Sequence, residues 1–357
     1  MSDAPRDRDC EFENAQEAKR AGLVHVSDED PGFYRRRAGK GFTYCDANGR
    51  RIVDAGIRER IRKLAIPPAY TDVWICANPR GHLQATGRDA RGRKQYRYHP
   101  RWRAVRDRGK FSRLIEFGER LPRLRRRLAR DLKRQGLPRE KILATVVSLL
   151  AETLVRIGNA RYSSENGSFG LTTLLSRHVE ILRGRALLRF RGKSGQKHAI
   201  AVDNAKLVRL LRRCQQLPGQ TLFQFIADSG PPQPVDSGMV NDYLRDSMGA
   251  EFSAKDFRTW GATVHALATL TPIGVPESDA EKAVVLKEAV ATVARALGNS
   301  PAVCRASYIH PAVIDGWIEG HLQKHVGAEE VAYPRKLEHA CLRFLRHAES
   351  RPRSASR

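Results

Sequence analysis

The spacing of apolar residues changes once along this chain, near residue 105, and this change sets the fold class. From Leu23 to Val105, short apolar runs are separated by turn signals such as Asn48-Gly49, a pattern typical of antiparallel strands. From Trp102 onward the apolar residues recur at helical spacing. The sequence therefore predicts an α+β fold, with a small β-rich N-terminal domain (22–105) and a larger, mainly α-helical domain (106–346).

Individual elements follow from the same pattern. Strands are expected in the first domain at 42–44, 73–76, 82–86 and 95–99. In the second domain we expect helices over 102–135, from Pro138 to about residue 154 and over 280–297, with a β-hairpin or small meander over 179–202.

The segment 298–311 predicts a helix end followed by a short new helix. Gly298 suits the position after a helix, and Ser300-Pro301 suits an N-cap followed by the first helical residue. The short helix should contain Tyr308 and end at His310-Pro311. At the chain ends we expect a disordered tail (1–21) and a basic, serine-rich tail (347–357).

The charge of the chain indicates a polyanionic partner. Its 357 residues include 64 Lys and Arg against 39 Asp and Glu, a formal net charge of +25, and nucleic acid is the first candidate for such a field. A ribosomal protein or a protein of anionic membranes would have the same charge, so composition leaves these classes open. No run of about 18 uncharged apolar residues is present, so no membrane helix is expected.

The six cysteines are scattered and form no Cys-x-x-Cys pair. This pattern indicates the reduced thiols of a cytoplasmic protein and neither a disulfide framework nor a zinc site. No metal-binding residues are expected.

Four residues stand in an order that suits attack by a phenol on a phosphodiester: Arg156, Lys193, Arg258 and Tyr308. An arginine fork matches two phosphate oxygens and keeps its proton, so the arginines are expected to clamp the non-bridging oxygens. Lys193, at a predicted hairpin tip, is placed to protonate the leaving 5′ oxygen. A strongly positive pocket favours the phenolate of Tyr308.

Longer motifs around these residues resemble the type IB DNA topoisomerases, in the compact form found in poxviruses and bacteria. The resemblance runs from about Gly22 to about Arg346. Its motifs lie at 67–75, 81–89, 91–99, 156–174, 192–193, 255–259 and 307–308.

This resemblance implies relaxation of supercoiled duplex DNA through a 3′-phosphotyrosyl intermediate with a free 5′ hydroxyl, strand swivelling and religation. The phosphotyrosyl ester keeps the energy of the broken bond, so religation needs no ATP. No step requires a metal, so no cofactor is expected and Mg²⁺ at most stimulates. Poxviral and nuclear relatives have a histidine where this chain has Asn299. An amide donates a hydrogen bond but does not shuttle protons near neutral pH, so the expected role of Asn299 is electrostatic.

Expected DNA contacts concentrate in the first domain. Residues 81–105 hold seven basic side chains and one acidic side chain, interleaved with aromatic residues. The side chains expected to bind DNA are Arg91, Arg93, Lys94, Tyr96, Arg97, Tyr98 and Tyr162. Phosphate contacts contain little sequence information, so we expect weak sequence preference. The resemblance implies a monomer, cytoplasmic and associated with the nucleoid.

Two other classes stay open on the sequence alone. A tyrosine recombinase or integrase shares the Arg, Lys, Arg, Tyr order, but recombinases have a histidine where this chain has Lys255, and a helical domain where this chain is β-rich. A non-catalytic basic nucleic-acid-binding protein would have the same charge. His310 is interpreted as a helix-ending residue before Pro311, and His178 and His198 remain ambiguous.

Overall fold

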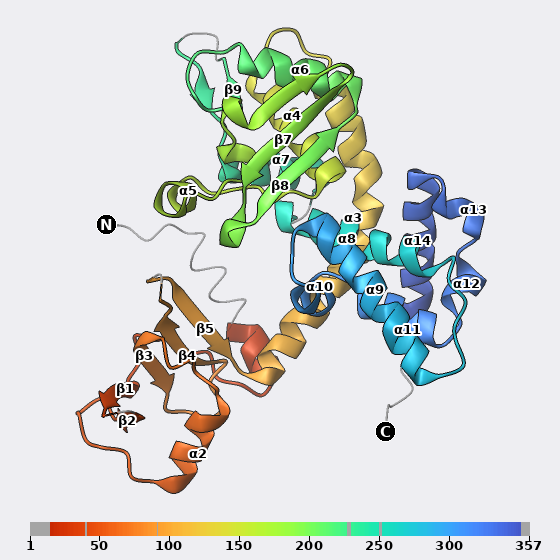
Figure 1. Cartoon of the computed structure of the whole chain (residues 1–357). Coiled ribbons are helices and arrows are strands. Elements are labelled where there is room, and N and C mark those ends of the chain that lie inside the picture. Colours follow the sequence, from red (N-terminus) through yellow and green to blue (C-terminus); the bar gives the residue numbers. More distant parts are fainter. Residues whose placement is uncertain (1–14, 40, 91, 227–229, 250–251, 351–357) are drawn as a thin grey trace. The chain divides into compact units, whose positions relative to one another are not determined.

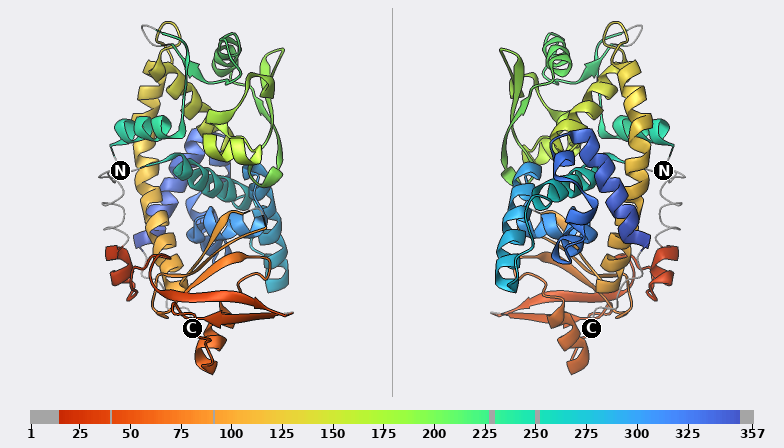
Figure 2. Two further views of the ribbon diagram at one scale, coloured as in Figure 1. Left: turned by 90° about the vertical axis from the view of Figure 1, so that its left-hand side faces the viewer. Right: turned by 90° about the vertical axis from the view of Figure 1, so that its right-hand side faces the viewer.

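The computed structural model describes residues 15–39, 41–90, 92–226, 230–249 and 252–350, and the chain divides into two compact units, 1–110 and 111–357. The division falls within α3 (Pro100–Asp131), a long helix drawn in yellow and orange in Figure 2. An antiparallel sheet comes first and a mostly helical region follows, which confirms the predicted α+β class. None of the described helices combines the length and the apolar character needed to cross a membrane.

The N-terminal unit is built on a five-stranded antiparallel sheet in the order β2-β1-β3-β4-β5. Its elements are β1 (Gly32–Ala38), β2 (Gly41–Cys45), α2 (Ala55–Lys63), β3 (Thr71–Cys76), β4 (Leu83–Arg88) and β5 (Lys94–Tyr98). Helix α2 buries Ile61 against Val73, Ile75 and Ala85 of the sheet. Trp74 and Cys76 of β3 are buried in a second small cluster with Leu83, so β3 buries apolar side chains on both faces.

The four strands expected in this unit are present, but the sequence did not predict β1 or α2. Strand β1 contains Arg35, Arg36 and Arg37, and most of its side chains are exposed or half-buried. The strand is held by backbone pairing to β2 and β3. Its sequence shows no alternation of apolar and polar residues from which a strand could be predicted. Helix α2 likewise buries only Ile61 fully.

The expectation of a disordered tail up to residue 21 is wrong for the part of it that is described. Residues 15–20 form a short helix, and Ala18 is fully buried with Leu23 and Trp102. This small apolar contact stabilises the segment, and six residues are too few to show a helical period in the sequence. At the other end α14 continues to Ser350, so residues 347–350 are helical.

The C-terminal unit combines a small sheet with many helices (Figure 1). Its strands are β6 (Val179–Leu182), β7 (Arg185–Arg191), β8 (Lys197–Val202), and the short β9 (Gln224–Phe225) and β10 (Gln233–Pro234). Its helices after α3 are α4 (Arg139–Thr153), α5 (Ala160–Asn166), α6 (Ala205–Gln215), α7 (Ser237–Met248), α8 (Ala254–Leu270), α9 (Asp279–Leu297), α10 (Pro301–Ser307), α11 (Pro311–Ile318), α12 (Leu322–His325), α13 (Ala328–Val331) and α14 (Pro334–Ser350), with 3₁₀ turns η1 (Leu171–Thr173), η2 (Ser176–His178) and η3 (Lys193–Gly195).

Helix α8 is the central helix of this unit. It packs against α4, α7, α9, α11 and α14, and it buries the polar residues Arg258, Thr259 and Thr263 along with its apolar ones. A helix that is buried on several sides is a rigid frame for whatever side chains project from it. The antiparallel sheet β6-β7-β8 confirms the expected meander, and its β7–β8 connection is the turn η3.

The α10–α11 junction differs from the expectation that one helix contains Tyr308 and ends at His310-Pro311. Helix α10 ends at Ser307, and Tyr308 is its C-cap, because the N–H groups of Tyr308 and Ile309 both donate to the carbonyl of Cys304. His310 begins the next helix, where its Nδ1 accepts from the N–H of Ala312. Thus His310 starts α11 and does not end α10.

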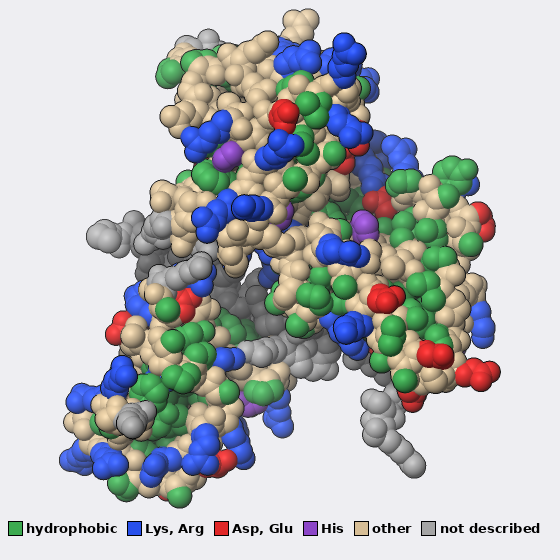
Figure 3. All heavy atoms as spheres, viewed as in Figure 1, with side chains coloured by type: hydrophobic (Ala, Val, Ile, Leu, Met, Phe, Trp, Pro, Cys, Tyr) green, Lys and Arg blue, Asp and Glu red, His purple; other side chains and the backbone are tan. Residues whose placement is uncertain are grey.

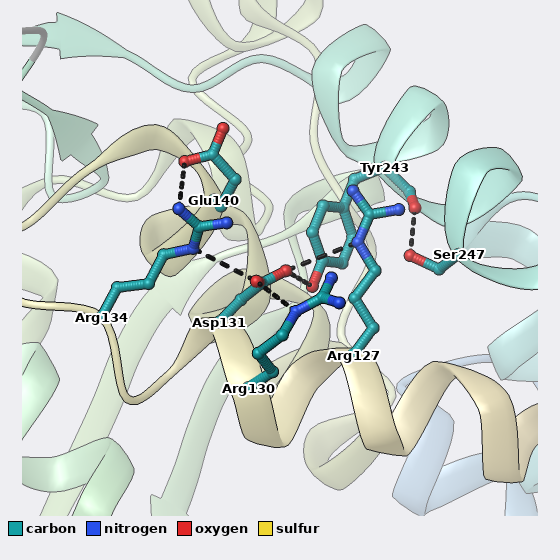
Figure 4. Close-up of polar contacts among 7 residues, drawn as sticks. All are labelled: Arg127, Arg130, Asp131, Arg134, Glu140, Tyr243 and Ser247. Carbon is teal, nitrogen blue, oxygen red and sulfur yellow. Dashed lines mark hydrogen bonds and ion pairs between the residues drawn. The ribbon is translucent and has the colours of Figure 1, made fainter.

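A buried carboxylate joins α3 to α7 (Figure 4). Asp131 is fully buried and accepts from the hydroxyl of Tyr243 at 2.9 Å and from Nε of Arg134 at 3.2 Å. Arg127 and Arg130 each place Nε 3.4 Å from the same carboxylate. Burial acts to raise the pKa of Asp131, but the hydrogen bonds from Tyr243, Arg134 and Arg130 outweigh it and hold the pKa below its usual value.

Asp131→Asn should therefore lower the free energy of unfolding at neutral pH by about 2–3 kcal/mol, since the arginines lose their buried partner. The folded pKa is depressed, so the charge contributes stability above the unfolded pKa of about 4 and loses it as the pH falls through the lower folded value. Urea unfolding of both proteins between pH 2 and 7 would measure this. Asp246→Asn, at an exposed position on α7, is the control. A variant as stable as the wild type at pH 7 would contradict the assignment.

Candidate active site

A cavity of about 530 Å³ in the C-terminal unit collects most of the predicted catalytic side chains. Its lining includes Arg156, Lys193, Arg258 and Tyr308, together with Phe169 and Lys255. These residues come from the segment after α4, from the segment before η1, from η3, from α8 and from the end of α10. The cavity is thus assembled from segments up to 152 positions apart in the sequence, as the difference between 308 and 156 gives.

Arg258 lines this cavity and is held there by two backbone carbonyls. It projects from α8, is 4% exposed, and donates from Nη2 to the carbonyl of Leu297 at 2.9 Å and from Nη1 to the carbonyl of Leu154. These carbonyls lie at the C-terminal ends of α9 and α4, where helix dipoles favour a cation. Burial, and then the charge of Arg156, lower the pKa of Arg258, which stays a cation near neutral pH.

Arg156 and Asn299 form a second polar group beside Arg258. Arg156 donates from Nη2 to Oδ1 of Asn299 and from Nη1 to the carbonyl of Gly298 at 3.4 Å. With its oxygen engaged, Asn299 keeps Nδ2 buried without a hydrogen-bond partner among the described residues. A buried, unpaired amide N–H has a strong free-energy preference for an acceptor.

The backbone around Arg156 leaves no room for side chains at two glycines. The carbonyl of Arg156 accepts from the N–H of Leu171 at 2.9 Å, and a Cβ on Gly170 would lie 2.5 Å from that oxygen. Gly158 has φ +96°, a conformation that favours glycine. The motif that contains Arg156 is therefore fixed by backbone contacts with the segment before η1.

Tyr308 lies against the guanidinium of Arg258. The Cζ of Arg258 is 5.2 Å from the centre of the Tyr308 ring. Burial acts to raise the pKa of Tyr308, but the charges of Arg258, Arg156 and Lys255, with a hydrogen bond from Arg258, outweigh it and place the pKa below its usual value. A lowered phenol pKa increases the fraction of phenolate, which is the nucleophilic form.

Lys193 stands at the start of η3, at the tip of the β7–β8 hairpin. The turn is closed by the N–H of Gly192 donating to the carbonyl of Gln196 at 2.7 Å, and it places Ser194 and Gly195 at positive φ. The lysine side chain is exposed, so it can reach a ligand in the cavity from the rim.

Sequence comparisons agree with this arrangement. The profile of the family described as "Eukaryotic DNA topoisomerase I, catalytic core" matches residues 99–324, and that described as "Bacterial DNA topoisomerase IB, N-terminal domain" matches residues 41–89. A DNA topoisomerase 1B of Acanthamoeba polyphaga mimivirus is 32% identical over 285 residues, which cover 78% of this chain and 85% of the relative. The chain belongs to the type IB DNA topoisomerase family. DNA topoisomerase 1B of vaccinia virus is 25% identical, over 72% of this chain and 81% of the relative.

Two further residues of the topoisomerase lie at this site without a role assigned from the sequence. Lys255, one turn before Arg258, lines the cavity and is among the charges that lower the pKa of Tyr308. From the sequence, Lys255 was used only to distinguish this chain from recombinases, which have a histidine at this position. The ring of His198 stacks on Phe190 and packs so close to Gly192 and Gly298 that a Cβ on either glycine would lie 2.5 Å from it.

Strand β5 presents several of the residues expected to bind DNA. Lys94, Tyr96 and Tyr98 are exposed, and the two tyrosine rings stack at 6.0 Å between centroids. Figure 3 shows many Lys and Arg side chains over this unit. The exposed cations of β1, of the loop after β2 and of α2 are Arg36, Arg37, Arg50, Arg51, Arg58, Arg62 and Lys63.

Some of the expected cations are already paired in this structure. Nζ of Lys94 lies 2.6 Å from Asp28, Nη2 of Arg93 lies 2.7 Å from Asp89, and Nη2 of Arg97 donates to the carbonyl of Ala65 at 3.0 Å. A phosphate would have to compete with these partners. Arg91 and the side chain of Tyr162 lie outside the described residues.

Proposed function

We propose that this topoisomerase relaxes supercoiled duplex DNA by cutting and resealing one strand, with Tyr308 as the nucleophile. The phenolate oxygen attacks a backbone phosphorus, a phosphorus–oxygen bond to Tyr308 forms, and the bond to the 5′ oxygen breaks. Lys193 gives its proton to that oxygen, so the cut strand leaves as a free 5′ hydroxyl. The strand swivels and the 5′ hydroxyl attacks the same phosphorus. The bond to Tyr308 breaks, the phenolate leaves, and the proton of the hydroxyl returns to the lysine.

The remaining groups stabilise charge on the phosphate. Arg258 and Arg156 would donate to the non-bridging oxygens from a site that excludes much of the water, where such interactions are strongest. The unpaired Nδ2 of Asn299 would supply a further neutral donor to a non-bridging oxygen. No proton transfer is assigned to Asn299.

The observation that supports this proposal most is the convergence of Arg156, Lys193, Arg258 and Tyr308 on one cavity. A non-catalytic DNA-binding protein has no need to lower the pKa of a half-buried tyrosine with two arginines. The proposed substrate is duplex DNA, bound by a monomer with little sequence preference. Binding to chromosomal DNA would place the enzyme at the nucleoid. Tyr96 and Tyr98 would pack on the DNA backbone from the N-terminal unit.

Relaxation should need no ATP, because the phosphotyrosyl ester stores the energy of the broken bond. It should need no metal either, because side chains carry out every proposed step. The test is relaxation of positively and negatively supercoiled plasmid in EDTA without nucleotide, followed by gel electrophoresis. We expect complete relaxation of both. An absolute requirement for magnesium or ATP would refute the mechanism, and activity restricted to plasmids with one particular site would instead favour a recombinase.

A further inference from the structure

A buried hydroxyl of α8, that of Thr263, hydrogen-bonds the backbone of the Tyr308–His310 segment. Its Oγ1 accepts from the N–H of His310 at 3.1 Å. The hydroxyl has one proton to donate, to the carbonyl of Thr259 at 2.8 Å or to that of Tyr308 at 3.3 Å. Thr263 is fully buried. A water molecule is therefore not available to replace these hydrogen bonds.

At the junction between α10 and α11, two backbone hydrogen bonds run back into α10. The N–H groups of Tyr308 and Ile309 both donate to the carbonyl of Cys304, one turn earlier in α10. These two bonds fix the backbone of Tyr308 relative to α10, and they do not themselves reach α8. The N–H of His310 is the next donor along the chain, and its acceptor lies 47 positions earlier, on α8.

Helix α8 also contains Arg258, whose guanidinium lies 5.2 Å from the Tyr308 ring. Helix α8 therefore positions two groups: the cation expected to bind the phosphate, and the backbone of the expected nucleophile. Reaction rates depend steeply on such registration, because an error of about 1 Å in the position of a reacting atom can cost about 100-fold.

From this geometry we infer that Thr263 is a positioning residue. Through the backbone of the Tyr308–His310 segment, it holds the nucleophile in position relative to Arg258, which is expected to bind the phosphate. The inference rests on the proposed function of Tyr308. Thr263 touches neither the phosphate nor the phenol in this role, so it acts on the rate of bond exchange in both directions and leaves DNA binding unchanged.

The test compares Thr263→Val, which keeps the shape and removes the hydroxyl, with Thr263→Ser, which keeps the hydroxyl. Thr145→Val is the matched control, because Thr145 is fully buried and donates to the carbonyl four residues earlier at 2.8 Å, as Thr263 does, but on α4. Single-turnover cleavage and religation of an end-labelled duplex would be measured with a bridging oxygen and with a 5′-bridging sulfur at the scissile phosphate, alongside duplex binding.

We expect Thr263→Val to slow cleavage and religation alike, by about tenfold or more, with the covalent fraction at equilibrium and the affinity for duplex nearly unchanged. Thr263→Ser should remain within about twofold of wild type, as should Thr145→Val. Sulfur should not rescue Thr263→Val, because its defect concerns the nucleophile and not the leaving group.

Wild-type rates in Thr263→Val would overturn the inference. So would an equal loss in Thr145→Val, which would indicate general packing, or full rescue by sulfur, which would move the defect to the leaving group. If the wild-type protein itself forms no covalent complex, the proposed function fails, and that result is distinguishable because it does not depend on the variants.

Discussion

Tyr308→Phe should abolish relaxation and covalent attachment to DNA while leaving duplex binding intact. The change removes one oxygen atom, and the remaining ring keeps its position against the guanidinium of Arg258. Since Tyr308 is only partly buried, the free energy of unfolding should change little. The rate of adduct formation should fall by at least about 1,000-fold, because no other group would form the phosphoester.

The measurement is denaturing electrophoresis of protein mixed with an end-labelled duplex, with a mobility-shift assay for binding on the same samples. Tyr333→Phe is the control, because Tyr333 is 56% exposed and lies after α13, away from the cavity lining. It should relax plasmid as the wild type does. Adduct formed by Tyr308→Phe would show that another residue is the nucleophile.

The local signals of the sequence predicted those elements that local chemistry determines. Ser300-Pro301 marks a helix start because a serine side chain caps the N–H of Val303, and Gly298 adopts φ +59° at the end of α9. The strands β3 to β5 were predicted because they contain short apolar or alternating runs and are separated by turns that contain glycine. Where an element is held by partners distant in sequence, as β1 is, the local pattern contains no equivalent signal.

The candidate site divides in the same way. Its charged members were found because long motifs surround them and because each chemical role requires a particular residue type. The hydrogen bonds of Thr263 to Tyr308 and His310 join positions 45 and 47 apart, and the Tyr243–Asp131 bond joins positions 112 apart. Neither threonine nor aspartate is unusual within a helix, so only the folded structure shows that these side chains connect elements.

Lys193→Ala should slow cleavage of ordinary DNA by about 100- to 10,000-fold, the range typical for loss of a general acid. A 5′-bridging sulfur in place of the oxygen should restore most of the rate, because a thiolate leaves without a proton. Lys193 is exposed at a hairpin tip, so its removal should not disturb packing. Lys197→Ala, at an exposed position on β8 of the same hairpin, is the matched control and should behave as wild type on both substrates.

The two substrates separate the possible roles of Lys193 because they differ only at the leaving atom. If the lysine merely attracted the phosphate, its loss would slow both substrates by the same factor. If it donates the proton, the ratio of sulfur to oxygen rates should rise in Lys193→Ala and remain unchanged in Thr263→Val, whose defect is expected at the nucleophile. An equal loss on both substrates would therefore exclude Lys193 as the acid while leaving Tyr308 as the nucleophile, and the proton donor would have to be sought among the other groups lining the cavity, such as Lys255.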